Sequence, residues 1–388
     1  MKLGVYGGTY NPVHNGHISA ALSAAGSLGL DKVLMIPTAT PPHKDVPDGI
    51  AAAQDRLEML RLAAVCDKRL VPSDMEIRRG GKSYTVDTLA ELKKEYPSAE
   101  LYLIIGTDML RSFETWYRAA DILKMASLAV CARKNAEKEE IPELSENLRR
   151  KYGADVTVIE NDIVDISSSE LRGLLKTRRG VEYLDGAVYG YIIKKRLYDA
   201  KPSFEWLREK SYEMLDPKRI PHVKGCEEEA EKLANRWGAN VEKAKEAAIL
   251  HDCTKKLDLE QQLELCAEYS IETDELERAS AKLLHAKTGA AIARDVFGMG
   301  DDVYNAILWH TTGREDMTLL EKVIYMADYI EQTRHFEGVD ELRKLAYEDL
   351  DEAMILGLRM SLDDMKASGI TPHGRSVDAL RYLEKEHR

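Results

Sequence analysis

The chain has 388 residues, of which 44% are hydrophobic and 31% charged, and it carries a formal net charge of −12. This length and composition predict a globular protein with room for two domains, and the acidic balance argues against nucleic acid or a membrane surface as a partner. Five cysteines without a CxxC pair indicate reduced thiols. Because we find neither a signal-peptide core nor an apolar run long enough for a membrane helix, we expect a cytoplasmic protein; a homo-oligomer stays open.

Residues 1–200 alternate short β-like runs with helical patterns. The β-like runs are KLGVYG (2–7), KVLMIPT (32–38), AELYLIIGTD (99–108), LAVCAR (128–133) and DVTVIE (155–160). Helical patterns such as ISAALSAAGSLG (18–29) and YTVDTLAELKKEY (84–96) fill intervals between them. This alternation predicts βαβ units on a parallel sheet.

The segment GGTYNPVHNGH, residues 7–17, directly follows the first β-like run. Its two leading glycines stand where a backbone must turn tightly or approach a ligand closely. Asn11 is a preferred N-cap residue and Pro12 suits the first helical position, so we expect a helix from about Val13. The free N–H groups and the positive dipole end of such a helix form a seat for phosphate.

His14 and His17 are three residues apart, so both would project from one face of that first turn. Two solvent-facing histidines are the alternative, but the preceding glycines and the cap favour a phosphate site. The segment resembles the GG(T/S)F(D/N)PxHxGH signature of the nucleotidyltransferase superfamily, and ISSSELR, residues 166–172, resembles its ISSSxxR element. Two motifs in this order imply a Rossmann-like nucleotidyltransferase domain with a parallel sheet over residues 1–200.

Within that superfamily, roughly residues 1–198 resemble bacterial nicotinate-mononucleotide adenylyltransferase. The resembling segments are PPHK (41–44), SYTVDTL (83–89) and GTD (106–108), followed by Trp116. The resemblance implies adenylyl transfer from ATP, accompanied by Mg²⁺, to nicotinate mononucleotide, a reaction of NAD biosynthesis. Transfer to another phosphorylated acceptor, nicotinamide mononucleotide or phosphopantetheine, is the alternative.

The resemblance also implies roles for individual residues. The catalytic residues would be His14, His17 and Arg172. ATP and its phosphates would lie against Gly7, Gly8, Thr9, Lys44, Arg133, Ser168, Ser169 and Arg172. The nicotinate mononucleotide would lie against Thr85, Gly106, Asp108 and Trp116.

Strand-like runs end after about residue 200, and helical patterns rich in Ala, Glu, Lys and Leu follow. This change predicts an all-α domain over residues 201–388, with a joint near Pro202. Polar groups interrupt its apolar helical faces at His222, His251, Asp252, His285, His310 and Asp328. Any one of them could be a hydrogen-bonded core residue. A buried cation explains them together, because imidazole and carboxylate groups are its usual ligands.

The order His…His-Asp…Asp resembles the HD phosphohydrolase superfamily, and residues from about 205 to 388 resemble bacterial symmetrical diadenosine tetraphosphatases. The resembling segments are KRIPHV (218–223), AILHD (248–252), HTTG (310–313) and ADYIE (327–331). The resemblance implies an HD-type helical domain that uses iron or another divalent transition metal to hydrolyse diadenosine tetraphosphate to two ADP. A different nucleotide phosphohydrolase and a nucleotide-sensing module without turnover are the alternatives.

The metal ligands that this resemblance implies are His222, His251, Asp252 and Asp328, of which Asp252 is also assigned to catalysis. The residues implied for substrate phosphate or a second metal are Arg219, Lys255, His285, His310, Thr311 and Arg334. The remaining histidines of this half, His335, His373 and His387, are expected at the surface. Cys253, within the HDxxK-like segment, is expected to fill a small apolar space.

Overall fold

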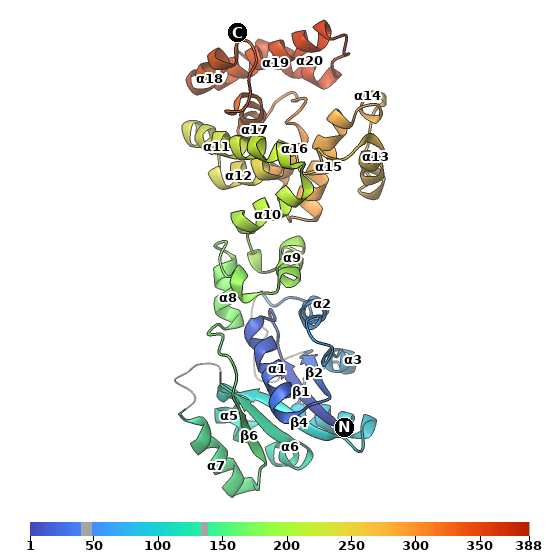
Figure 1. Ribbon diagram of the computed structural model, residues 1–388, viewed down its shortest axis with the longest axis vertical. Coiled ribbons are helices and arrows are strands. Elements are labelled where there is room, and N and C mark those ends of the chain that lie inside the picture. The colour runs from blue at the N-terminus through green and yellow to red at the C-terminus, as the bar shows by residue number, and fades with distance from the viewer. Residues whose placement is uncertain (40–48, 133–138, 388) are drawn as a thin grey trace. The chain divides into compact units, whose positions relative to one another are not determined.

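The computed structural model describes residues 1–39, 49–132 and 139–387 (Figure 1). The chain divides into two compact units, Met1–Lys201 and Pro202–Arg388. The division falls beside Pro202, where the sequence changes from alternating strand and helix patterns to helical patterns alone.

A parallel sheet of six strands forms the centre of the first unit. The strands are β1 (Lys2–Gly8), β2 (Lys32–Pro37), β3 (Leu70–Pro72), β4 (Glu100–Gly106), β5 (Ser127–Cys131) and β6 (Val156–Ile159). They lie in the order β3-β2-β1-β4-β5-β6, and all neighbours pair in parallel, which confirms the predicted Rossmann-like α/β fold. Because the strand order reverses between β1 and β4, the loops at their carboxyl ends diverge and leave room for a ligand.

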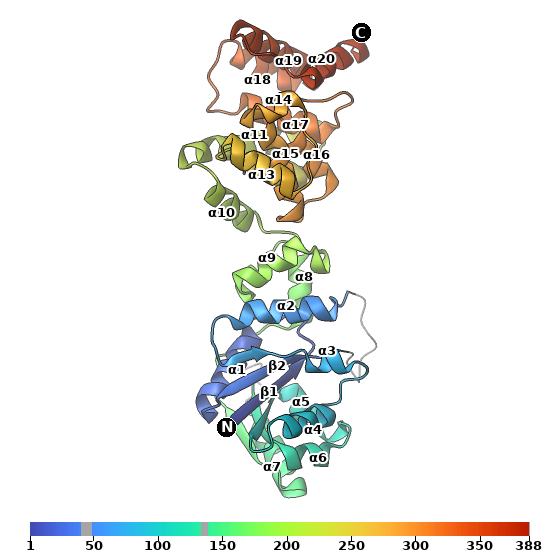
Figure 2. The same ribbon diagram turned by 90° about the vertical axis from the view of Figure 1, so that its right-hand side faces the viewer.

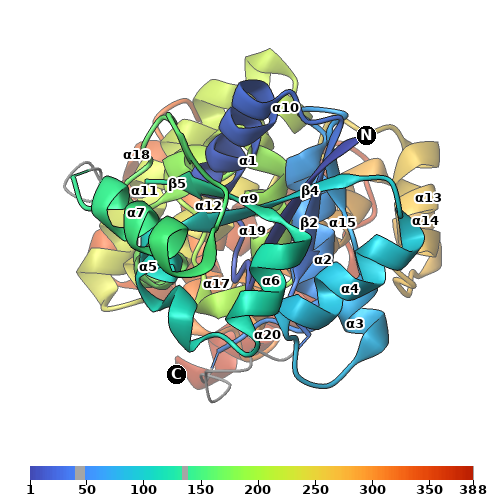
Figure 3. The same cartoon turned by 90° about the horizontal axis from the view of Figure 1, so that it is seen from below.

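Helices cover both faces of this sheet. They are α1 (Asn15–Leu28), α2 (Ala53–Ala64), α3 (Met75–Arg79), α4 (Thr85–Glu95), α5 (Thr107–Ser112), α6 (Ala119–Met125), α7 (Ile141–Tyr152), α8 (Ser168–Leu175) and α9 (Gly186–Lys194). Figure 3 shows α1 on one side of the strands and α4 and α6 on the other. Alternate strand residues therefore face different helices, and Val5 and Leu103 share a buried cluster with Leu89 of α4 and Ile122 of α6.

The third strand, β3, was not predicted from the sequence. It spans three residues and pairs only with β2, at the edge of the sheet. A segment this short cannot display the alternation of apolar and polar residues by which a strand is recognised.

The predicted start of the first helix is wrong by two residues. Helix α1 begins at Asn15 with His14 as its N-cap, and Asn11 and Pro12 lie in the preceding turn. The side chain of Asn11 does not cap the helix, because its Oδ1 accepts hydrogen bonds from the backbone N–H of Ala51 at 3.0 Å and from the Tyr198 hydroxyl at 2.9 Å.

The second unit consists of helices, without a strand in residues 202–387, so the all-α prediction is confirmed. The helices are α10 (Phe204–Met214), α11 (Ile220–Trp237), α12 (Val241–Leu250), α13 (Leu259–Glu268), α14 (Glu275–Arg278), α15 (Ala281–Asp295), α16 (Asp301–Leu308), α17 (Leu319–Ile330), α18 (Val339–Glu348), α19 (Leu350–Ala367) and α20 (Gly374–Glu386). Figure 2 shows α18, α19 and α20 together on one side of α17. Small buried residues such as Ala230 of α11 and Ala247 of α12 allow these helices to pack closely.

None of the helices in the described parts of the chain combines the length and the apolar character needed to cross a bilayer.

Two candidate active sites

A cavity of about 540 Å³ opens at the carboxyl ends of β1 and β4, where the strand order reverses. Its walls include the loop Gly7–Asn11, the histidines His14 and His17 at the start of α1, and Ser167–Ser169 with Arg172 of α8. The cavity thus collects donors from two helix N-termini and two sequence motifs, a combination suited to an extended chain of phosphates.

Direct hydrogen bonds join the two motifs. The Ser168 hydroxyl donates to the Pro12 carbonyl at 2.9 Å, and Arg172 Nη1 donates to the Asn11 carbonyl at 2.7 Å. Ser167 caps α8 by accepting from the Glu170 N–H, which leaves the side chains of the first turn to face the loop and the cavity. Ser168 and Arg172 therefore hold the turn at residues 11–12 in place as well as lining the cavity.

The rings of His14 and His17 lie side by side, with their centroids 3.8 Å apart. His17 Nδ1 accepts a hydrogen bond from the His14 backbone N–H at 3.3 Å. A neutral imidazole that accepts at Nδ1 carries its proton on Nε2. His17 can therefore donate from Nε2 to an anionic oxygen in the cavity that it lines.

A second cavity, of about 320 Å³, adjoins the first and shares Gly7–Thr9 and Asp108 with it. Thr85, the first residue of α4, and Trp116 line this second cavity, whereas Gly106 lines the first. Aromatic rings form part of the wall of this second cavity. The ring centroids of Tyr84 and Tyr117 lie 4.8 Å apart, and Trp116 packs on the buried ring of Phe113 at 5.2 Å. Such walls suit a flat heteroaromatic ring. Lys44 and Arg133, also predicted here, lie outside the described residues.

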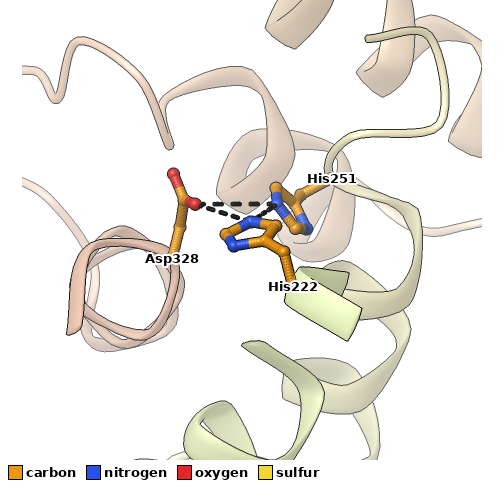
Figure 4. A group of neighbouring side chains, drawn as sticks. All are labelled: His222, His251 and Asp328. Carbon is orange, nitrogen blue, oxygen red and sulfur yellow. Dashed lines mark hydrogen bonds and ion pairs between the residues drawn. The ribbon is translucent and has the colours of Figure 1, made fainter. Parts of the chain in front are cut away.

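In the second unit, buried imidazoles and carboxylates from several helices converge. Figure 4 shows His222 of α11, His251 at the end of α12 and Asp328 of α17 directed toward one another. His222 Nε2 lies 3.0 Å from Asp328 Oδ1 and 3.3 Å from His251 Nε2. The ligand atoms of these three residues all lie within 4.8 Å of one another, close enough to hold one metal ion.

Asp252 lies between this group and a second pair of histidines. Its Oδ2 faces His251 Nε2 at 3.4 Å, and its Oδ1 faces His285 Nε2 at 3.1 Å and His310 Nε2 at 3.8 Å. The Nε2 atoms of His285 and His310 are 3.1 Å apart. His251, Asp252 and His310 form a second group with metal-ligand spacing, so the predicted ligands and the two further histidines form one continuous cluster.

The outer nitrogens of three of these rings face hydrogen-bond acceptors. His251 Nδ1 contacts the Ala248 carbonyl at 2.7 Å, His310 Nδ1 the Ile307 carbonyl at 2.6 Å, and His222 Nδ1 a carboxylate oxygen of Glu331 at 3.0 Å. Because these partners only accept, each Nδ1 carries a proton, and each Nε2 is the nitrogen that faces the carboxylates of the cluster. With the outer nitrogen engaged, the inner Nε2 of each ring is the atom that could bind a cation beside Asp252 and Asp328, so the donor set fits a metal.

Three basic side chains surround the two carboxylates. Arg219 Nη2 lies 2.5 Å from Asp252 Oδ2, and Arg334 Nη2 lies 2.5 Å from Asp328 Oδ1. Lys255 Nζ lies 3.6 Å from Asp252 Oδ1, and burial lowers the pKa of this lysine. Burial by itself would raise the pKa of Asp252, but the neighbouring histidines, above all His251, outweigh it and hold that pKa well below its ordinary value.

The predicted surface position of His373 is wrong. Its side chain is buried, caps α20, and contacts Asp274 Oδ2 at 2.8 Å. Asp274, Glu277 and His373 also have metal-ligand spacing, but Glu277 already pairs with Lys287 and with Arg375, each at 2.7 Å. This group is therefore a compensated ion network that holds α20 against α14.

Thr311, predicted beside His310, is half-buried, and Cys253 is buried as expected.

Comparisons with known proteins match both units. The cytidylyltransferase-like family model matches residues 5–177, and the HD domain model matches residues 219–333. A probable nicotinate-nucleotide adenylyltransferase from Geobacter sp. (strain M21) is 38% identical over 213 residues, which cover 51% of this chain and 98% of that protein. Another, from Pelobacter propionicus, is 38% identical over 217 residues, covering 52% of this chain and 100% of that protein.

The first unit belongs to the nicotinate-nucleotide adenylyltransferase family.

The second unit carries an HD domain. The crystal structure of a predicted HD superfamily hydrolase involved in NAD metabolism, from Clostridium acetobutylicum, is 38% identical. It covers 48% of this chain and 100% of that chain, with a TM-score of 0.47. The family matches confirm the predicted resemblance of the first unit to nicotinate-mononucleotide adenylyltransferase and that of the second unit to the HD superfamily.

One residue that organises the adenylyltransferase site was missed in the sequence. Arg56 of α2 is 2% exposed and donates to the carbonyls of Thr9 at 2.8 Å, Thr38 at 2.7 Å and Ala51 at 3.2 Å. It thereby ties together the loops that follow β1 and β2, and burial lowers the pKa of this guanidinium. A single arginine in a helical pattern ordinarily lies on the solvated face, so nothing in its sequence context revealed this role.

We expect Arg56→Met to destabilise the adenylyltransferase unit by about 2 kcal/mol, because buried carbonyls lose their donor, and to weaken ATP binding. Urea unfolding and ATP titration would measure both effects. Arg61→Met is the matched control, since Arg61 lies on the same helix, is half-exposed and pairs only with Glu58 among the described residues. Equal effects of the two substitutions would contradict the role given to Arg56.

Removal of metal should destabilise the HD unit selectively. Without a cation, the buried carboxylates of Asp252 and Asp328 lose a positive charge that would compensate them inside the cluster. We therefore expect chelator treatment of the purified protein to lower the unfolding temperature of the HD unit and to leave that of the adenylyltransferase unit unchanged. Calorimetry before and after metal is restored would measure this. An unchanged transition in a protein that demonstrably lost its metal would contradict the proposed ligand set.

Proposed function

We propose that the first unit transfers an adenylyl group from ATP to nicotinate mononucleotide, giving nicotinate adenine dinucleotide and pyrophosphate. The observation that carries the proposal is the pair of adjoining cavities. One is lined by phosphate-binding groups and the other by aromatic rings, and they meet at Gly7–Thr9 and Asp108. Two nucleotides seated in them would bring their phosphates together at that junction. The relatives that match this unit carry the name of the same activity.

The chemistry requires positioning and charge stabilisation rather than a protein nucleophile. An oxygen of the mononucleotide phosphate attacks the α-phosphorus of ATP, the bond to the bridging oxygen breaks, and pyrophosphate leaves. His17, which can donate from Nε2, would stabilise charge on the reacting phosphate together with His14. Ser168, Ser169 and Arg172 would hold the departing phosphates, and Mg²⁺ would enter with ATP as part of the substrate.

For the second unit, we propose metal-dependent hydrolysis of a dinucleoside polyphosphate, specifically the symmetrical cleavage of diadenosine tetraphosphate to two ADP. The proposal is supported by side chains that suit a metal ion and side chains that suit phosphate, which lie next to each other in this unit. Imidazoles and carboxylates suited to a metal lie beside Arg219, Lys255 and Arg334, which suit phosphate oxygens. Binding of a nucleotide alone would not require four imidazoles directed into the cluster, those of His222, His251, His285 and His310.

The residues that would hold the metal are His222, His251, Asp252 and Asp328, and we propose iron or another divalent transition metal because nitrogen and oxygen ligands suit that series. Such an ion supplies Lewis acidity, which activates water and polarises a phosphoryl group. Arg219 and Arg334 would orient the polyphosphate. His285 and His310 would bind a phosphate oxygen or a second cation on the other side of Asp252.

We expect His17→Ala to lower the rate of adenylyl transfer by about 10²–10³-fold, because one donor to the reacting phosphate is lost, while ATP binding persists. The assay compares nicotinate mononucleotide, nicotinamide mononucleotide and phosphopantetheine as acceptors, and nicotinate mononucleotide should give the highest kcat/KM. Preference for another acceptor would replace the proposed substrate, and normal turnover of the variant would remove His17 from the mechanism.

Asp252→Ala should abolish hydrolysis of diadenosine tetraphosphate and leave adenylyl transfer unchanged, because Asp252 contributes only to the cluster in the HD unit. Product analysis of the parent protein should find two ADP, and metal analysis should find a transition metal. ATP plus AMP as products would exclude symmetrical cleavage. Tight binding of the nucleotide without turnover would favour a sensing module.

A further inference from the structure

Glu331 is a buried carboxylate directly after α17 that has no assigned role. It is 0% exposed, and both of its oxygens accept hydrogen bonds. Oε1 accepts from His222 Nδ1 at 3.0 Å and from the Thr333 hydroxyl at 2.5 Å, and Oε2 accepts from the Thr333 backbone N–H at 2.7 Å. The carboxylate is therefore fixed from two sides, and one of its partners is a candidate metal ligand.

The position of His222 in its helix explains why a carboxylate is needed. His251 and His310 follow the last residues of α12 and α16, so each can donate from Nδ1 to a carbonyl of the final helical turn. His222 lies in the first turn of α11, where the backbone offers free N–H groups rather than free carbonyls. An acceptor for its Nδ1 has to come from another element, and Glu331 provides it.

Gly225 provides the space for this carboxylate. It lies one turn after His222 on α11, and a Cβ atom built at that position would stand 2.3 Å from Glu331 Oε2 and 3.2 Å from its Cδ. Any side chain at position 225 would therefore push the carboxylate away from α11. Glycine is otherwise unfavourable in the middle of a helix, so its presence here has a local reason.

We propose that Glu331 is a positioning residue. Its carboxylate keeps the His222 proton on Nδ1 and directs Nε2 toward Asp328 and His251, while Gly225 allows the carboxylate to approach. The inference rests on the proposed metal-dependent function of the HD unit. A histidine whose outer nitrogen donates to a carboxylate is both oriented and made a stronger ligand.

The test measures the Co²⁺ affinity of the metal-free full chain by competition with a chelator. Glu331→Gln should weaken Co²⁺ binding by about 10- to 100-fold, because the amide has no charge and only one acceptor atom. Gly225→Ala substitutes neither a candidate ligand nor Glu331, but its methyl group should displace the Glu331 carboxylate. It should therefore also weaken Co²⁺ binding, although alanine stabilises the helix. The Co²⁺ absorption spectrum should change in both variants.

Glu321→Gln is the matched control for a merely structural effect. Glu321 is also a buried carboxylate of α17, but it pairs with Arg314 and closes the cap at Thr318, away from the cluster. Its substitution should lower the unfolding temperature without changing Co²⁺ affinity. Proton spectra of the metal-free protein supply a second readout, since the Nδ1 proton of His222 should give a downfield, slowly exchanging signal in the parent and a weaker, upfield-shifted one in Glu331→Gln.

The outcomes separate this inference from the proposed function. If the parent binds Co²⁺ and both Glu331→Gln and Gly225→Ala bind it equally well, the positioning role is overturned and the metal site stands. If the parent binds no Co²⁺, the metal-dependent function fails, and the Nδ1 proton signal of His222 still decides whether Glu331 holds this ring. If Glu331→Gln does not fold, Gly225→Ala decides by the same criterion.

Discussion

Asp252 is buried where several helices of the second unit meet, and its charge has no access to water. A carboxylate in that position is tolerated only if other groups compensate it. The compensation comes from imidazole rings on both sides and from Arg219, and these groups are in turn held by Ala248, Ile307 and Glu331. The arrangement of α11, α12, α15, α16 and α17 follows from bringing these partners together.

The first unit meets the same constraint with the opposite charge. Arg56 is a buried cation without a carboxylate partner among the described residues, and backbone carbonyls of the loops after β1 and β2 compensate it instead. Those carbonyls belong to the segments that line the two cavities. The cost of burying the guanidinium is thereby offset by hydrogen bonds that also fix the shape of the nucleotide site. Arg172 acts similarly, since it holds the Asn11 carbonyl and lines the cavity.

Both sites are suited to phosphate in a chain whose overall charge is −12. The attraction for an anion is therefore local in each unit, and it is achieved by different means. In the first unit, helix N-termini, histidines and Arg172 present hydrogen-bond donors to a cavity. In the second, Arg219 and Arg334 sit over carboxylates that a divalent cation would share. This difference fits the two proposed reactions, because transfer between nucleotides needs alignment and hydrolysis needs an activated water.

The sequence by itself determined the two fold classes, because the β-like and helical periodicities depend only on which side chains face a core. It also identified motif residues that the structure brings together, such as His17 and Arg172, which line one cavity, and His222 and Asp328, which are in contact. The tertiary structure decided where α1 begins and which partners the buried polar side chains have, because neither depends on the local sequence pattern alone. Asn11 is a good cap by type, yet its side chain is engaged by Ala51 and Tyr198, so α1 begins later. Arg56, Glu331 and the buried His373 acquire their roles from partners distant in the chain, and such partners exist only once the elements have packed.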